Sequence, residues 1–153
     1  MCGDNDHFHN EQDRHMQIFY ELIIKTKGQG LYDFTKKTID WVKKQKIHSG
    51  ILNLNILHTS ASLTIQENAD PDVLYDIKNF FDKLVPMNND FYKHTTEGID
   101  DMPAHLKTML TNTQLTLSVK NKKPILGTWQ GLYLFEHRLE NQNRTISHHL
   151  MGD

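Results

Sequence analysis

The sequence has very little cysteine: Cys2 is the only one among 153 residues. A single thiol cannot form a disulfide within the chain, which favours a reducing, intracellular compartment. A catalytic role for Cys2 is disfavoured, because nothing around it provides the fixed electropositive setting that activates a thiol. Long apolar runs are absent as well, which excludes a membrane-spanning helix. We therefore expect a cytoplasmic protein that does not enter a membrane.

The sequence also lacks a large excess of charge of either sign. The chain carries 17 basic and 19 acidic residues, for a formal net charge of −2. It has no basic stripe, so the composition argues against a nucleic-acid partner. The phosphate-loop patterns GxxxxGK[ST] and GxGxxG, the HExxH zinc motif and the CxxC pair do not occur, which excludes the sites that these patterns build.

What is present is an ordinary globular composition, with 37% hydrophobic and 24% charged residues. A chain of this length builds one domain with its own core. Residues 1–15 are polar, contain no apolar segment typical of a secretory signal, and include His7, His9 and His15. We expect them to form a disordered, solvated tail ahead of a single domain over residues 16–153.

Hydrophobic periodicity predicts a mixture of strands and helices. Alternation of apolar and polar residues predicts strands over 16–26, 50–58, 59–66, 115–119, 132–137 and 145–150. A period near 3.6 predicts helices over 33–46 and 71–85, and a short helix over 104–110 follows Pro103. The order is roughly β-α-β-β-α-α-β-β-β. Helices and strands do not alternate regularly, which favours an α+β fold with mixed or antiparallel sheets.

The helix over 71–85 has the clearest signals. Asp70 is a good N-cap, Pro71 takes the favoured first position, and Pro86 ends the helix. Its apolar residues form one stripe, which we expect to lie in the core: Val73, Ile77, Phe80, Phe81 and Leu84.

His58 is the first candidate for chemistry. It follows the apolar row of Leu52, Leu54 and Ile56, so a period of two turns its imidazole inward. With His94 and His105 it would give three neutral imidazoles and an open fourth position, the arrangement of a catalytic zinc site. The alternative is that each histidine is separately hydrogen-bonded at the end of an element.

Other polar residues allow further interpretations. Ser60 and Ser62 suggest a serine nucleophile, but no GxSxG elbow presents one, and hydrogen bonding to substrate or backbone suits them better. Arg138 and Arg144 suit bidentate binding of phosphate or carboxylate, with solvated surface arginines as the alternative. Trp129 is expected to be a buried anchor.

Four segments together resemble the YjbQ-like family, described as secondary thiamine-phosphate synthases. They are HTSASLTIQENADPDV (His58 to Val73), YKHTTEGIDDMPAHLK (Tyr92 to Lys107), GTWQGLYLFEHR (Gly127 to Arg138) and Arg144 before the last strand. The resemblance begins near residue 16 and runs to the end of the chain. It implies a small α+β fold, a homotrimer, and a pocket near subunit boundaries.

The resemblance also implies roles for individual residues. His58, His94 and His105 would lie near a bound divalent metal ion or anion. Zinc or another transition metal suits imidazole, whereas magnesium would accompany a diphosphate. The alternative is that the three histidines act as acid–base groups and phosphate donors. Catalytic roles fall on His58, Asp101 and Glu136. Asp70 occupies another recurrent position. Substrate binding falls on Thr59, Ser60, Glu67, Lys107, Trp129, Gln130, Arg138 and Arg144.

The implied reaction joins hydroxymethylpyrimidine diphosphate to a thiazole phosphate and releases pyrophosphate. At 153 residues the chain is too short for the (β/α)8 barrel of the dedicated synthases, which usually needs ~250 residues. We therefore expect the synthase reaction as a secondary activity on a small phosphorylated metabolite. The alternatives are a metal-dependent hydrolase of such a metabolite and a non-catalytic protein that binds a metal or metabolite.

Overall fold

The structure is a computed structural model that describes residues 15–153. The predicted tail over residues 1–15 therefore lies outside the described residues, apart from His15. The same holds for Cys2, His7 and His9.

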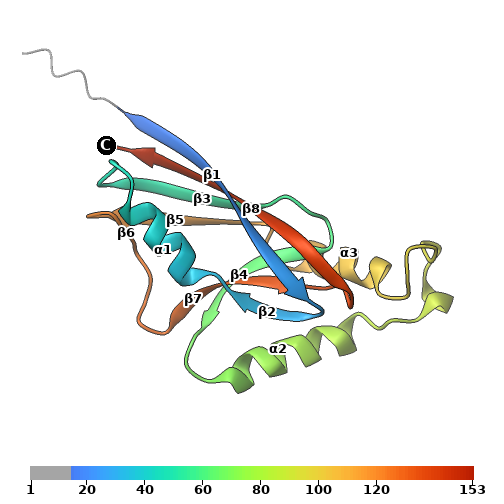
Figure 1. Ribbon diagram of the computed structural model, residues 1–153. Helices are drawn as coiled ribbons and strands as arrows, with labels where there is room; N and C mark the ends of the chain where they lie inside the picture. Colours follow the sequence, from blue (N-terminus) through green and yellow to red (C-terminus); the bar gives the residue numbers. More distant parts are fainter. Residues whose placement is uncertain (1–14) are drawn as a thin grey trace, which may run out of the picture.

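Eight strands form two antiparallel sheets, with three α-helices and one 3-10 turn among the described residues (Figure 1). The larger sheet has the order β1-β8-β3-β5-β6 and the smaller one β2-β7-β4. This arrangement confirms the predicted α+β domain. The elements are β1 (Met16–Lys27), β2 (Gly30–Asp33), α1 (Thr35–Lys43), β3 (Gly50–Ile56), β4 (Ala61–Glu67), α2 (Pro71–Leu84), η1 (Asn89–Phe91), α3 (Asp101–Leu110), β5 (Gln114–Lys120), β6 (Lys123–Pro124), β7 (Gln130–Glu136) and β8 (Asn141–Gly152).

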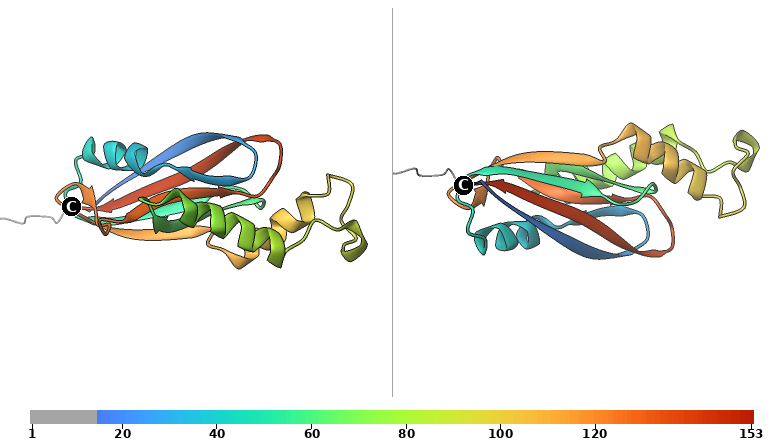
Figure 2. Two further views of the ribbon diagram at one scale, coloured as in Figure 1. Left: turned by 90° about the horizontal axis from the view of Figure 1, so that it is seen from below. Right: turned by 90° about the horizontal axis from the view of Figure 1, so that it is seen from above.

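The core lies between the inward faces of the two sheets. Alternate residues of β1, β3, β5 and β8 turn inward and pack against β4 and β7, as the period of two requires. Helix α1 adds Val42, and Trp41 packs against the cluster as expected. Figure 2 shows that the segment that joins α2 to α3 projects beyond the ends of the strands, with α3 at the same end of the molecule. The elements that carry His94 and His105 therefore lie at one end of the molecule.

Helix α2 begins as predicted but is buried less than predicted. The side chain of Asp70 caps it by accepting a hydrogen bond from the backbone N–H of Asp72. The expectation that its apolar stripe forms core is wrong: no residue of α2 is buried, and Phe80 is 59% exposed. Phe81 packs edge-on against Phe135 of β7. The period of 3.6 shows that a helix is amphipathic but not what covers its apolar face.

Several element bounds also differ from the predictions. Helix α3 begins at Asp101 rather than Ala104, so Pro103 lies in its first turn. Strand β2 has four residues, too few for a periodic signal, and its pairing with β7 holds it in place. Strand β8 has twelve residues because it pairs along its whole length with β1.

Within residues 15–153, no helix is long and apolar enough to cross a membrane. The cytoplasmic location stays a prediction from the sequence.

Candidate functional site

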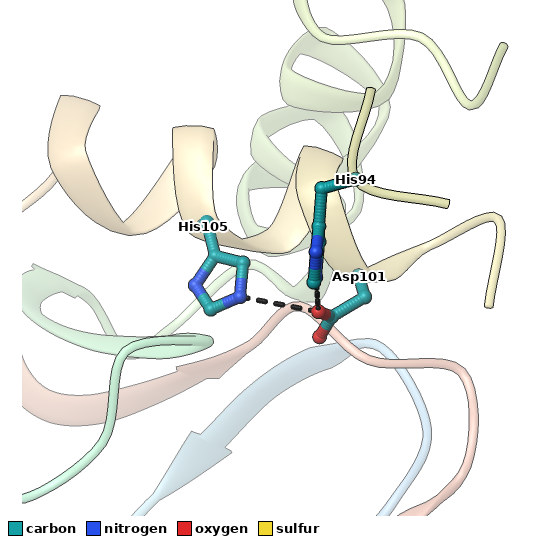
Figure 3. Close-up of side chains that lie close together, drawn as sticks. All are labelled: His94, Asp101 and His105. Carbon is teal, nitrogen blue, oxygen red and sulfur yellow. Dashed lines mark hydrogen bonds and ion pairs between the residues drawn. The ribbon is translucent and has the colours of Figure 1, made fainter. Parts of the chain in front are cut away.

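Two histidines converge on one aspartate at the start of α3. Asp101 and His105 are four residues apart and share one face of the helix, and His94 reaches them from the preceding loop (Figure 3). His94 Nε2 lies 2.6 Å from Asp101 Oδ2, and His105 Nε2 lies 3.1 Å from the same oxygen. One atom from each of the three side chains falls within 4.8 Å of the others.

Surrounding residues fix the orientation of this cluster. The other oxygen of Asp101, Oδ1, accepts a 2.5 Å hydrogen bond from Arg138 Nη1, and Arg138 is held in turn by Asp100 and by the carbonyl of Glu97. His105 Nδ1 lies 2.9 Å from the carbonyl oxygen of Thr59 and donates to it, which leaves Nε2 facing Asp101. Metal-binding histidines and carboxylates are commonly oriented by partners of this kind.

The electrostatics of the cluster follow from its ion pairs. The hydrogen bond to Asp101 raises the pKa of His94, and the charge of Glu97 adds to this. Burial alone would raise the pKa of Asp101, but the hydrogen bond from His94 and the charge of Arg138 bring it below its ordinary value. The carboxylate is thus kept ionised, which is the form that can bind a cation.

The donor set fits a divalent transition metal. Two imidazole nitrogens and one carboxylate oxygen are ligands of zinc and of non-haem iron. Both Nε2 atoms lie within hydrogen-bond distance of the same carboxylate oxygen, so one cation could contact all three ligand atoms. Magnesium fits less well because it prefers a shell of oxygen atoms.

His58 lies outside this cluster, contrary to the three-histidine arrangement suggested by the sequence. Strand β3 ends at Ile56, so the period of two that would turn His58 into the core does not reach it. Instead its Nε2 accepts a 2.9 Å hydrogen bond from the backbone N–H of Thr145 in β8. Asp101 takes the place that the third imidazole was expected to fill.

His58 nevertheless shares a pocket with a residue of the cluster. The pocket has a volume of about 320 Å³ and is lined by His58, Thr59, His105, Thr108, Met109 and Thr113. Partial burial and the positive charge of Arg144 lower the pKa of His58, although the charge of Glu136 opposes them. The pocket is thus lined by both an imidazole whose pKa is lowered and a candidate metal ligand.

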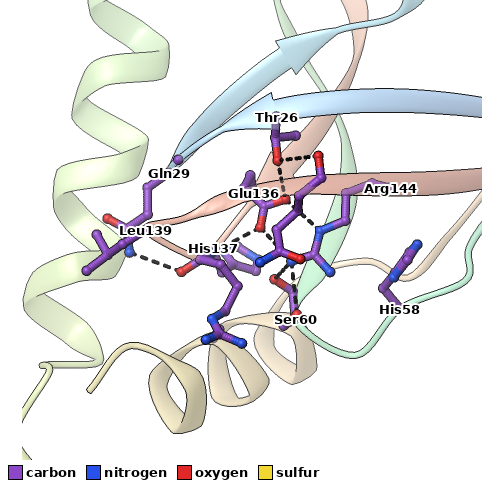
Figure 4. A network of polar contacts seen from close by, with 12 residues as sticks. Thr26, Gln29, His58, Ser60, Glu136, His137, Leu139 and Arg144 are labelled. Carbon is purple, nitrogen blue, oxygen red and sulfur yellow. Dashed lines mark hydrogen bonds and ion pairs between the residues drawn. The ribbon is translucent and has the colours of Figure 1, made fainter. Parts of the chain in front are cut away.

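The arginine predicted to hold an anion is committed to a buried carboxylate. Arg144 binds both oxygens of Glu136, from Nε at 2.6 Å and from Nη2 at 2.5 Å, and Nη2 also donates to Ser60 (Figure 4). Glu136 further accepts from Thr26 and from the backbone of Arg138. The catalytic role predicted for Glu136 has no support in this geometry, because its carboxylate is fully buried and fully engaged.

The other two basic side chains predicted to hold substrate are paired as well. Arg138 binds Asp100 and Asp101. Lys107 is buried in α3, and its Nζ lies 2.6 Å from a carboxylate oxygen of Asp82 in α2. In the described residues, Arg138, Arg144 and Lys107 therefore each neutralise at least one carboxylate.

Comparisons with known proteins identify the family. Residues 20–153 match the UPF0047 protein YjbQ-like family. The chain belongs to this family. It is 44% identical over 140 residues to a UPF0047 protein of Synechocystis, covering 92% of this chain and 93% of the relative. It is 39% identical over 133 residues to the UPF0047 protein YjbQ of Escherichia coli O157:H7, covering 86% and 96%.

Solved structures agree with the YjbQ-like fold. A YbjQ-like protein of Sulfolobus solfataricus superposes with a TM-score of 0.83 at 23% identity, covering 92% of this chain and 100% of that one. A YjbQ/UPF0047 protein of Clostridium acetobutylicum gives a TM-score of 0.72 at 36% identity, covering 84% and 95%.

The residues that the YjbQ-like resemblance assigned to substrate do not all meet. Strands β4 and β7 pair so that Ala61 faces Glu136 at one end and Glu67 faces Gln130 at the other. Six residue steps along a strand span roughly 20 Å. Glu67, Gln130 and Trp129 thus lie far from Glu136 within one chain. Trp129 is also 64% exposed, so the expectation of a buried anchor is wrong: it precedes β7 in an open turn.

The serine alternative loses its basis. Ser62 Oγ does lie 2.9 Å from an imidazole nitrogen, His137 Nε2, but both side chains are buried and no substrate can reach them. Ser60 Oγ accepts from Arg144 instead. Both hydroxyls therefore serve hydrogen bonds inside the fold.

Sequence reasoning missed four residues of the site. Thr108, Met109 and Thr113 line the pocket, and Thr145 holds His58. The spacing D-x-x-x-H from Asp101 to His105 was a usable signal, because it puts both side chains on one helical face once the helix begins at Asp101. The pairing of Thr145 with His58 had no signal in sequence, since 87 residues separate them.

Proposed function

We propose that this YjbQ-like chain is a metal-dependent enzyme that acts on a small phosphorylated metabolite, with the ion held by His94, Asp101 and His105. The observation that carries the proposal is the convergence of both imidazoles on Asp101 Oδ2, directly beside the pocket shared with His58. The partners Arg138 and Thr59 orient two of the three ligands. Such preorganised surroundings are typical of functional metal sites.

The basic residues near the site are paired with carboxylates, so we propose that a metal ion offsets the negative charge of a phosphorylated substrate. A phosphorylated substrate brings negative charge, but Arg138, Arg144 and Lys107 already face carboxylates. A bound divalent ion would polarise a phosphoryl oxygen and offset the charge of a leaving group. The Lys107–Asp82 pair links α3 to α2, and the Arg144–Glu136 pair links β8 to β7.

The reaction we propose first is transfer of the pyrimidinylmethyl group to thiazole phosphate, with release of pyrophosphate. Hydrolysis of a phosphorylated metabolite is the second candidate, because a zinc-type donor set with open positions is also typical of hydrolases. Incubating the purified protein with both precursors tests the first reaction by the appearance of thiamine phosphate. Release of phosphate or pyrophosphate without the thiazole phosphate would identify a hydrolase, and tight ligand binding without turnover would contradict both.

The metal site has its own test. We expect the wild-type protein to retain about one equivalent of zinc or another transition metal, and the double variant His94→Ala/His105→Ala to lose it. Elemental analysis of the full chain measures this, and the comparison between variants cancels any metal held by residues 1–14. His48→Ala, which removes an exposed histidine in the loop before β3, is the matched control and should keep the metal. Equal metal content in all three proteins would contradict the site.

Catalytic dependence on the ligands follows from the same proposal. Loss of a residue that only orients a ligand commonly costs 10- to 100-fold, so His105→Ala should lower turnover by roughly 100-fold or more. Unchanged turnover in a folded His105→Ala protein would show that the reaction does not use this site.

We also propose that the chain assembles as a homotrimer. The support is the outer face of the larger sheet, where apolar side chains lie exposed on neighbouring strands: Phe19, Ile23, Ile51 and Met151. Exposed apolar patches of this kind commonly mark an interface. Sedimentation analysis should give three times the chain mass for the wild type and a smaller species for Ile23→Glu. A wild-type monomer would contradict the proposal.

A further inference from the structure

The binding chemistry of the pocket follows from the end of strand β3. Strands β3 and β8 pair up to Ile56 and Ile146, and Leu57 N–H still donates to the Thr145 carbonyl oxygen. The chain then turns away, so a β3 carbonyl no longer accepts from Thr145 N–H. The imidazole of His58 accepts from it instead, at 2.9 Å. The His58 ring therefore completes the hydrogen bonding of the sheet where the strand ends.

This hydrogen bond decides which nitrogen of His58 carries hydrogen. A backbone N–H can donate only to an unprotonated ring nitrogen, so Nε2 holds a lone pair and Nδ1 holds the hydrogen of the neutral ring. Within residues 15–153, His58 Nδ1 has no hydrogen-bond partner. It is not buried, because the one buried side-chain nitrogen or oxygen in this range that lacks a partner is His137 Nδ1. His58 Nδ1 therefore reaches solvent as a free donor.

Two threonine hydroxyls extend this donor group. Thr59 and Thr113 line the same pocket, both are exposed, and neither hydroxyl has a hydrogen-bond partner in the described part of the chain. By contrast, the hydroxyl of Thr108 donates to the carbonyl oxygen of Ala104 and is not available. The pocket thus offers up to three neutral donors and, through His105, the edge of the candidate metal centre.

We propose that these donors bind the phosphoryl oxygens of the substrate, and that His58 acts as a fixed neutral donor from Nδ1 rather than as a metal ligand or a base. The substrate class rests on the proposed function. Neutral N–H and O–H donors are common partners of phosphate oxygens, and His58, Thr59 and Thr113 meet in a pocket next to His105. The phosphoryl group would then lie between these donors and the metal ligands.

The adjacent residues His58 and Thr59 have different roles in this arrangement. The Thr59 carbonyl orients His105 toward Asp101, and the His58 ring beside it faces the pocket. One short segment after β3 therefore orients a metal ligand and supplies a donor to the substrate. The tautomer of His58 can be observed directly, because protonated and unprotonated ring nitrogens differ in their ¹⁵N chemical shifts.

The first experiment is long-range ¹H–¹⁵N correlation NMR of the full-length, ¹⁵N-labelled protein. We expect His58 to be neutral, with hydrogen on Nδ1 and a bare Nε2. A charged His58, or hydrogen on Nε2, would overturn the proposal. This measurement uses the wild-type protein and needs no variant to fold.

The second experiment measures by titration calorimetry how tightly inorganic pyrophosphate binds to the wild type, His58→Asn and His58→Gln. The asparagine amide can donate from the position of Nδ1, whereas the glutamine amide reaches only the position of Nε2. A hydrogen bond to a charged group contributes 1.5–3 kcal/mol, so we expect roughly 10- to 100-fold weaker binding for His58→Gln and binding within about threefold of wild type for His58→Asn. Equal loss in both variants, or none in His58→Gln, would contradict the role of Nδ1.

A third protein separates this inference from the proposed function. In His94→Ala, which lacks a proposed metal ligand, pyrophosphate binding should still weaken when His58 is also changed to glutamine. If the wild-type protein holds no metal but this dependence on His58 persists, the donor site stands without the enzyme proposal. If His94→Ala binds pyrophosphate with no dependence on His58, the donor site is wrong.

Discussion

At the scale of single residues, a buried charge of this protein is paired with one of opposite sign. Arg144 and Glu136 are both buried and bound to each other through two short contacts. Removing the charge of one partner leaves the other buried and unpaired, which typically costs 3–5 kcal/mol. We therefore expect Glu136→Gln to lower the free energy of unfolding by about 3–5 kcal/mol, as measured by urea denaturation.

An exposed ion pair is the control for this prediction. Lys36 and Asp40 form a pair one turn apart on the surface of α1, where water screens both charges. Asp40→Asn should leave the urea midpoint close to that of the wild type. If Glu136→Gln were equally harmless, the buried pair would contribute nothing to the stability of the fold.

The residues of the site were only partly predictable. His94, His105 and Asp101 were all singled out from the sequence, and the structure brings them together. His58 was expected to join them, but its direction depends on where β3 ends, and strand ends are set by pairing with β8 rather than by local pattern. The commitment of Arg144 to Glu136 depends likewise on tertiary contacts.

At the scale of elements, the first turn of helix α2 carries a cap whose contribution can be measured. No residue of the helix is fully buried, and the side chain of Asp70 caps it ahead of the favoured Pro71. Replacing an N-cap aspartate by alanine costs about 1 kcal/mol. We expect Asp70→Ala to destabilise the protein by about that amount and to speed hydrogen exchange within α2 more than within β8.

Asp76→Ala is the matched control, because it removes an exposed carboxylate from the middle of the same helix. Alanine favours helix there, so exchange in α2 should not accelerate. Faster exchange in both variants would show that charge, and not the cap, controls the helix.

Elements were predicted well where their signal was local. The alternation in β1 and the capped helix α2 were found because each carries its own pattern over eleven or more residues. Strand β2 and the first four residues of β8 were missed, because GLYD is too short to show a period and Asn141–Arg144 is polar. These segments are strands because β7 and β1 pair with them.

At the scale of the whole molecule, two buried histidines make stability depend on pH. Burial lowers the pKa of His148 to about 4, although its hydrogen bond to the Ile146 carbonyl opposes this. Burial and the charges of Lys107 and Arg144 lower the pKa of His137 to about 3. In the unfolded chain a histidine titrates near 6.5, so between that value and the folded pKa the unfolded state binds more protons.

The contribution of these two histidines to stability should therefore be intact above about pH 6.5 and be lost as the pH drops. Each histidine contributes a slope of about 1.4 kcal/mol per pH unit, down to about pH 4 for His148 and about pH 3 for His137. In His148→Gln we expect the slope between pH 6 and 4.5 to be smaller by about that amount, as measured by urea denaturation across the range. His48→Gln, which changes an exposed histidine, is the control. An unchanged slope in His148→Gln would place the acid sensitivity elsewhere.

The hydrogen bond between Thr145 and His58 has a consequence for anyone who wants to move this site to another protein. A graft of the loop that carries His58 would bring the imidazole but not the amide that fixes it, because that amide belongs to a strand 87 residues further along the chain. A working transplant must include the end of β8 in its present alignment with β3. The smallest portable form of the site is thus a pair of strands and the helix α3 beside them, not a loop.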